Sequence, residues 1–109
     1  MMMHIQELET MQRHGIKMLT CVMNDGGYGA EAHKFRAKGM DASQTIHGRP
    51  DFARLSRAFG LSGEKVAETG RVRSLLDAYQ LGAGAALWDL DVDDMIPSAM
   101  FRRLHYGEV

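Results

Sequence analysis

A short apolar run that ends in a glycine-rich turn is the feature that most constrains how this chain folds. Ile16 to Met23 reads IKMLTCVM and lies between Gly15 and Asn24. Because the run is apolar on both faces, it predicts a strand in the middle of a parallel sheet. The hexapeptide NDGGYG follows, and its three glycines permit backbone angles that other residues avoid. Ala30 to Ala37 then has the pattern of a helix, so the predicted order is strand, glycine turn, helix.

The other apolar patterns predict further helices and strands in alternation. Helices are predicted over residues 4–14, 50–59 and 71–80 and after Pro97, strands over 64–68 and 85–92, and a long loop over 38–49. This alternation indicates a parallel sheet flanked by helices, the doubly wound α/β class. We expect one domain over residues 1–109. Two or three strands make only a partial sheet with unpaired edges, so we also expect the complete fold to have strands upstream of Met1.

Composition excludes several classes of protein. Thirteen basic and 14 acidic residues give a net charge of −1, so no long-range field draws the chain to nucleic acid or to an anionic membrane. No apolar stretch approaches the ~20 residues of a membrane span, and the start lacks the pattern of a signal peptide. The single Cys21 is expected to be a buried free thiol, which is typical of a cytoplasmic protein.

The glycine turn is the predicted binding site. In an open parallel sheet, ligands bind beyond the carboxyl ends of the strands, where residues 24–29 are expected. The helix after the turn directs unpaired N–H groups at it, which favours a phosphate. Asp25 adds a carboxylate, and a magnesium ion would bridge that carboxylate to the phosphate oxygens. The pattern therefore predicts a magnesium diphosphate site, although a glycine turn after a strand can also be a plain connection.

Three segments of the sequence carry a resemblance to a known family. They are IQELETMQRHGIKMLTCVMNDGGYGAEAHKFRAKG, GRPDFARLSRAFG and ALWDLDVD, and the resemblance covers the chain from about Ile5 to Val92. In this order the segments resemble thiamine diphosphate enzymes of the acetolactate synthase, pyruvate oxidase and benzoylformate decarboxylase group. That family binds its cofactor with a GDG triplet and, further along the chain, an asparagine-rich turn followed by glycines. MNDGGYG is similar to this second half of the motif.

The resemblance assigns roles to the residues of the turn. It implies that Asp25 coordinates magnesium through its side chain and that Gly27 does so through its backbone carbonyl. The remaining residues of the turn would line the thiamine diphosphate: Asn24, Gly26, Tyr28, Gly29 and Ala30. No catalytic residue is assigned, because in such enzymes the cofactor performs the chemistry on a 2-keto acid.

The sequence departs from the family pattern at its start. A GDG triplet is expected a few residues before Ile5, where the chain reads MMMH. Without the aspartate of that triplet the ion keeps too few protein ligands for tight binding. We therefore expect this polypeptide alone to be inactive and to bind thiamine diphosphate poorly, and its unpaired sheet edges lead us to expect a homo-oligomer.

Two other functions are compatible with the sequence. A non-catalytic α/β module could retain the scaffold and use its sheet edge to associate with a partner. A nucleotide-binding Rossmann half fits less well, because NDGGYG does not supply GxGxxG spacing. The five histidines have no metal-binding spacing and are expected on the surface or in loops, with His33 and His47 as the two that would face a substrate.

Overall fold

The computed structural model describes residues 1–107 of the 109-residue chain. Its elements in chain order are η1 (Met2–His4), α1 (Glu7–Arg13), β1 (Leu19–Asn24), α2 (Gly29–Ala37), η2 (Ser43–Thr45), α3 (Phe52–Ala58), β2 (Ser62–Val66), η3 (Thr69–Arg71), α4 (Val72–Leu81), β3 (Ala86–Asp91) and α5 (Ala99–His105), where η marks a 3-10 helix. The chain divides into two compact units. The first unit joins residues 1–23 to 51–91, and the second joins residues 24–50 to the described residues from Val92 onward.

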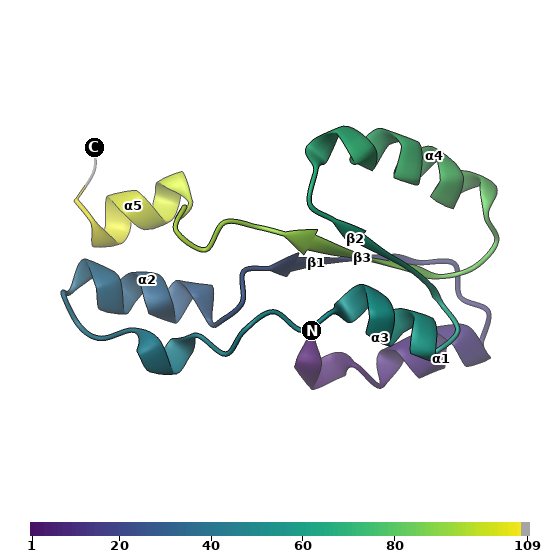
Figure 1. Ribbon diagram of the computed structural model, residues 1–109, viewed down its shortest axis with the longest axis horizontal. Coiled ribbons are helices and arrows are strands. Elements are labelled where there is room, and N and C mark those ends of the chain that lie inside the picture. Colours follow the sequence, from purple (N-terminus) through teal and green to yellow (C-terminus); the bar gives the residue numbers. More distant parts are fainter. Residues whose placement is uncertain (108–109) are drawn as a thin grey trace. The chain divides into compact units, whose positions relative to one another are not determined.

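A three-stranded parallel sheet forms the centre of the first unit. The strand order is β1-β3-β2, and the register of β2 on β3 pairs Ser62 with Ala86 and Val66 with Leu90. α1 and α3 lie on one side of this sheet and α4 on the other (Figure 1). The predicted α/β class, a small parallel sheet flanked by helices, is therefore confirmed, and every predicted helix and strand is present with slightly different bounds.

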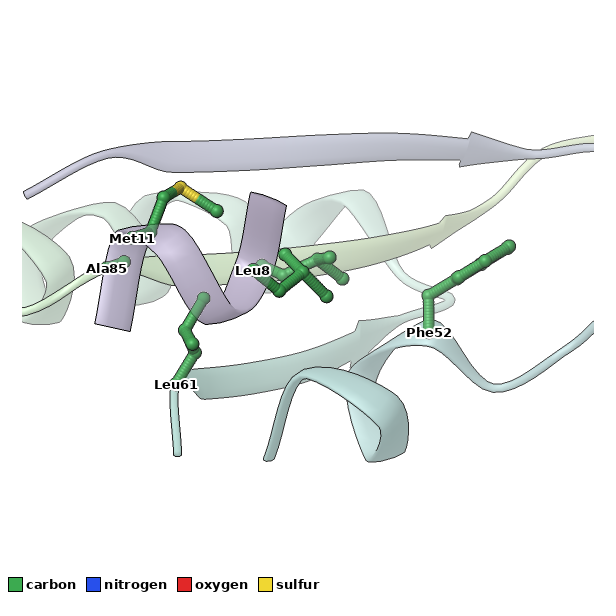
Figure 2. Close-up of a cluster of buried hydrophobic side chains, with 6 residues drawn as sticks. Leu8, Met11, Phe52, Leu61 and Ala85 are labelled. Atoms are coloured by element: carbon green, nitrogen blue, oxygen red, sulfur yellow. The ribbon is translucent and has the colours of Figure 1, made fainter. Parts of the chain in front are cut away.

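The hydrophobic core lies between the sheet and the pair α1 and α3. It consists of Leu8, Met11, Phe52, Leu61, Ala85 and Leu87 (Figure 2). Leu8 and Met11 are one helical turn apart, so they share the buried face of α1. Leu87 of β3 is fully buried beneath them, while the next residue, Trp88, is buried on the side of α4 because side chains alternate along a strand.

Polar contacts fix where α3 begins and how closely it approaches the sheet. Asp51 caps the helix by accepting a hydrogen bond from the Arg54 amide at 2.7 Å. The buried carboxylate of Asp89 accepts another from the Phe52 amide at 3.0 Å. Gly63 on β2 lies against α3, and a Cβ atom there would collide with backbone and side-chain oxygens of that helix. The helix therefore packs directly on the strand.

Two expectations about the first strand are wrong for the described residues. β1 is an edge strand of the sheet and not a central one. Cys21 is exposed, as is Met23 with 64% of its surface accessible, whereas Val22 packs on the core. The reason is the period of the strand: covering only one face partly buries Val22 and leaves its two neighbours exposed.

The single-domain expectation stays a prediction. No helix within residues 1–107 combines the length and the apolar character needed to cross a bilayer.

Candidate functional site

The predicted site is a tight turn in the second unit, between the end of β1 and the first residue of α2. Gly26 adopts a φ of +81°, in the region that favours glycine. α2 then begins at Gly29, three residues later. The sequence NDGGYG thus forms the predicted connection: its first residue, Asn24, ends β1, and its last residue, Gly29, begins α2.

A second loop braces this turn. The Gly26 carbonyl accepts hydrogen bonds from the amides of His47 and Gly48 at 3.1 and 2.9 Å. The Tyr28 amide donates to the Thr45 carbonyl at 2.8 Å, so that Gly27 and Ile46 form a short antiparallel bridge. The long loop predicted after α2 is therefore ordered where it meets the turn, and it holds the backbone of the turn in one conformation.

The carboxylate of Asp25 folds back over its own turn. One oxygen accepts a hydrogen bond from the Gly27 amide at 3.2 Å. The other lies against the α-carbon of Gly29, where an added Cβ would overlap it. The glycine at the first position of α2 therefore makes room for the carboxylate. Asp25 can adopt this conformation only because residue 29 has no side chain.

Several main-chain groups near Asp25 form no hydrogen bond with another group of residues 1–107. The carbonyl of Gly27 accepts no hydrogen bond there, and the amides of Gly29 and Ala30 donate none. The amides are among the unpaired donors that begin every helix, at the positive end of its dipole. One carboxylate and one carbonyl oxygen are hard donors, and the adjacent N–H groups suit an anion.

The donor set fits a cation only if the ligand contributes to its coordination. Within the described part of the chain, no three His, Cys, Asp or Glu side chains lie close enough to hold a metal ion. Magnesium commonly takes one or two protein carboxylates and completes its shell with phosphate oxygens and water. Asp25 and Gly27 are therefore compatible with a shared magnesium phosphate group.

Two of the residues expected to line a cofactor are directed elsewhere. The buried side chain of Asn24 donates to the Pro50 carbonyl at 3.0 Å, so it supports the turn from behind. The Tyr28 side chain is exposed, and its ring meets the edge of the His47 ring at a centroid distance of 5.1 Å. Of the seven predicted residues, the turn thus brings together the functional groups of Asp25, Gly27, Gly29 and Ala30.

Sequence reasoning missed one residue that supports the site. Arg49 donates to the carbonyl of Asn24 at 2.8 Å and to the carbonyl of Val92 at the same distance. It therefore ties the turn to the segment that leads to α5. A lone arginine between a glycine and a proline carries no periodic signal, so only the folded chain shows this role.

The segment after β3 adds a charged cluster to the second unit. Asp94 forms an ion pair with Arg36 of α2 at 3.1 Å and lies 3.9 Å from Arg49. The hydrogen bond from Arg36 lowers the pKa of the Asp94 carboxyl below its ordinary value of 3.8, and the nearby positive charges act in the same direction.

A small parallel sheet flanked by helices, whose first strand is followed by a glycine turn and a helix, places the chain in the α/β class. Comparison with known proteins gives the family. Residues 1–89 match the thiamine pyrophosphate enzyme C-terminal TPP binding domain, so the chain belongs to this family of thiamine diphosphate-binding domains. The family predicted from MNDGGYG is confirmed.

Two relatives refine the comparison. The chain is 30% identical over 96 residues to a protein of Mycobacterium tuberculosis (strain ATCC 25618 / H37Rv) assigned as acetolactate synthase large subunit IlvB2, a match covering 87% of this chain. It is 31% identical over 70 residues, or 62% of its length, to the acetolactate synthase large subunit of Parasynechococcus marenigrum (strain WH8102). The matches span 17% and 11% of the two relatives, so the chain corresponds to a small part of each.

Proposed function

We propose that this chain supplies the part of a thiamine diphosphate-dependent 2-keto acid lyase or carboligase, of the acetolactate synthase type, that anchors magnesium and the cofactor diphosphate. The observation that carries the proposal is the turn itself. The carboxylate of Asp25 lies over the first turn of α2, next to a carbonyl without a hydrogen-bond partner in residues 1–107. The family match and the names of the two relatives support the same assignment.

Each group of the turn has a distinct role in this proposal. Asp25 would hold the magnesium ion through its carboxylate, and Gly27 would hold it through its carbonyl oxygen. The amides of Gly29 and Ala30 would donate to diphosphate oxygens at the positive end of α2. Bound thiamine diphosphate would supply the carbon nucleophile that reacts with a 2-keto acid, while the chain positions and neutralises its diphosphate end.

The donor set also predicts the strength of binding. One carboxylate and one carbonyl leave most of the magnesium shell to water and to the ligand, and magnesium gives up its water reluctantly. We therefore propose that the 109-residue polypeptide alone binds magnesium thiamine diphosphate weakly, with a Kd on the order of 1 mM, and does not turn over a 2-keto acid.

A titration followed by ¹H–¹⁵N NMR tests the site and its strength together. Adding magnesium thiamine diphosphate up to about 10 mM should shift the amides of Asp25–Ala30 and leave those of β2 unchanged. The shifts should require magnesium and should not occur with thiamine, which lacks the diphosphate. Absence of any shift at the turn would refute the anchor, and a micromolar Kd would refute the expected weakness.

The chain offers a matched pair of aspartates for the same titration. Asp41, like Asp25, accepts a hydrogen bond from the amide two residues later, at 2.9 Å from Ser43. Asp25→Ala should weaken binding at least tenfold, and Asp41→Ala should change it less than twofold. Equal effects of the two substitutions would mean that Asp25 is only a turn residue.

The edge of β1 favours a second candidate, a non-catalytic module that self-associates. Arg57 and Arg71 donate to the carbonyls of Gly63 and Lys65, so side chains block part of the edge strand β2. β1 reads LTCVMN and has no charged residue. The hydrogen bond from the Ala86 amide to the Met18 carbonyl shows that even-numbered residues face β3.

The main-chain groups of Leu19, Cys21 and Met23 therefore face the open edge, and uncharged open edges pair with other strands. An antiparallel pair of β1 strands centred on Cys21 would bring the two thiols within disulfide reach, at a Cα separation of about 5.5 Å. Mild oxidation should then give a covalent dimer at a first-order rate that is independent of dilution while the protein concentration stays above the Kd of the dimer, and Cys21→Ser should abolish it. A monomer by light scattering at high concentration would exclude this function.

A further inference from the structure

The first unit contains a cavity between α4 and the sheet. Its volume is about 240 Å³. Residues of β2 and β3 form one wall, residues of α4 form the other, and the loop from α4 to β3 closes one side. We refer to it as the α4 cavity. The lining residues that matter here are Glu64 of β2, Leu75, Ala78 and Tyr79 of α4, and Ala86 and Trp88 of β3.

Polar contacts at its two ends hold α4 over this side of the sheet. Just before the helix, Arg71 pairs with Glu64 at 3.3 Å and donates to the Lys65 carbonyl at 3.2 Å. In the last turn, the Gln80 carbonyl accepts a hydrogen bond from the Lys17 side chain at 2.8 Å. None of the ten residues of α4, all of which the structure describes, is buried. The helix is thus attached at its ends, while its middle does not close on the sheet.

Two glycines in the loop after α4 leave one side of the cavity without side chains. Gly82 and Gly84 line it there. An added Cβ would meet no atom within 4 Å at Gly84 and only ordinary van der Waals contacts, at 3.5 Å or more, at Gly82. Neither residue has the positive φ that favours glycine. Backbone geometry and close packing therefore do not require glycine at these positions, and the missing side chains leave room for a ligand to enter.

The lining of the α4 cavity favours an uncharged aromatic ligand. Trp88 is only 5% exposed and Tyr79 is half-buried, so two aromatic rings border the space, beside Leu75. A third ring placed against them gains more than its buried area alone provides. Glu64 is the one charged side chain among the described lining residues, and Arg71 already pairs with it. A charged ligand would therefore lose its water without a free counter-ion to replace it.

The surroundings of Tyr79 also disfavour a cation. The ammonium group of Lys17 lies 5.3 Å from the centre of the Tyr79 ring. A second positive charge at the same ring would be repelled by this ammonium group. The aromatic lining is therefore suited to a neutral ring and not to an ammonium ligand.

The volume limits the ligand to one or two rings. Drug-sized molecules occupy pockets of about 300–1,000 Å³, whereas a cavity of about 150 Å³ can hold one benzene molecule. The 240 Å³ of the α4 cavity lies between these values. We propose that it binds a small uncharged aromatic molecule, which packs on the rings of Tyr79 and Trp88. The binding needs neither magnesium nor thiamine diphosphate, so it does not rest on the proposed function.

Four ligands, titrated in magnesium-free buffer, test the site on the unmodified protein. The chain has one tryptophan, so the indole N–H of Trp88 gives a single NMR signal that reports on the cavity. Phenol should shift this signal with a Kd on the order of 1 mM. Cyclohexanol, which lacks the aromatic ring, should bind about fivefold more weakly. Benzoate and benzylammonium, which are charged, should bind roughly fivefold more weakly as well.

Three results would overturn the proposal. The first is the absence of a shift at about 20 mM phenol, which would mean that the cavity holds only water. The second is equal binding of phenol and cyclohexanol, and the third is tighter binding of either charged ligand.

Filling the cavity tests where phenol binds. Ala86 is buried in the wall, so Ala86→Leu should occupy the space and weaken phenol binding about tenfold. Ala78→Leu should do the same from α4, at an exposed position where a larger side chain does not threaten folding. Ala83 is exposed and does not line the cavity, so Ala83→Leu should leave the Kd within about twofold. If the folded filling variants bind phenol as tightly as Ala83→Leu does, the ligand binds elsewhere and the proposal is wrong.

Discussion

Replacing Leu87 by alanine tests whether the interface between the sheet and its two helices holds the first unit together. Leu87 is 0% exposed and lies in the core cluster with Leu8, Met11 and Phe52. Leucine-to-alanine changes at such sites cost about 2–5 kcal/mol, because they remove buried methyl groups and leave a cavity. We take about 3 kcal/mol as the expected loss, since α1 is a short helix that can partly collapse onto the space.

Urea denaturation measures this loss, with the fluorescence of Trp88 as the signal. The chain has a single tryptophan, which is buried in the same unit, so the emission reports on that unit alone. With an m value of about 1–3 kcal/mol/M, a loss of 3 kcal/mol lowers the midpoint by roughly 1–3 M. This loss is a substantial part of the free energy of unfolding of a typical domain, which is about 5–15 kcal/mol.

The control is the same substitution at a leucine with the opposite environment. Leu81, the last residue of α4, is 91% exposed. Leu81→Ala should change the free energy of unfolding by less than about 0.5 kcal/mol. If the two variants unfold at the same urea concentration, the core between the sheet, α1 and α3 is not what stabilises this unit.

Three further predictions concern the contacts of α3 and the charged cluster of the second unit. Gly63→Ala should cost about 2 kcal/mol or more, because the added methyl group meets α3; the same urea assay would contradict this with an unchanged midpoint. Asp51→Ala should cost about 1 kcal/mol by removing the cap, whereas Asp51→Asn should cost much less; equal losses would mean that the charge matters and not the hydrogen bond. The pKa of Asp94 is lowered in the folded state, so its pair with Arg36 should stabilise the second unit above pH 3.8 and be lost as the pH falls through the lowered pKa. The side-chain shifts of Arg36 in an NMR titration should follow that loss, and a transition above pH 4 would contradict the sign.

The local pattern of the sequence determined the elements and the family. An apolar run of eight residues between a glycine and an asparagine can hardly be anything but a buried or half-buried strand, and NDGGYG forces a turn before the helix that begins at Gly29. These are short-range properties, because backbone freedom and hydrophobic period act over a few residues. The MNDGGYG motif, together with its neighbours, was therefore enough to predict the thiamine diphosphate-binding family.

Only the tertiary structure decided which faces and groups of those elements are used. The run around Cys21 looks equally apolar on both sides, and the partial burial of Val22 with exposure of Cys21 follows from where α1 and α3 pack. The burial of His33 likewise requires the contact with Phe101, far along the chain. Such outcomes depend on long-range contacts, and no pattern within a few residues encodes which distant segment will cover a face.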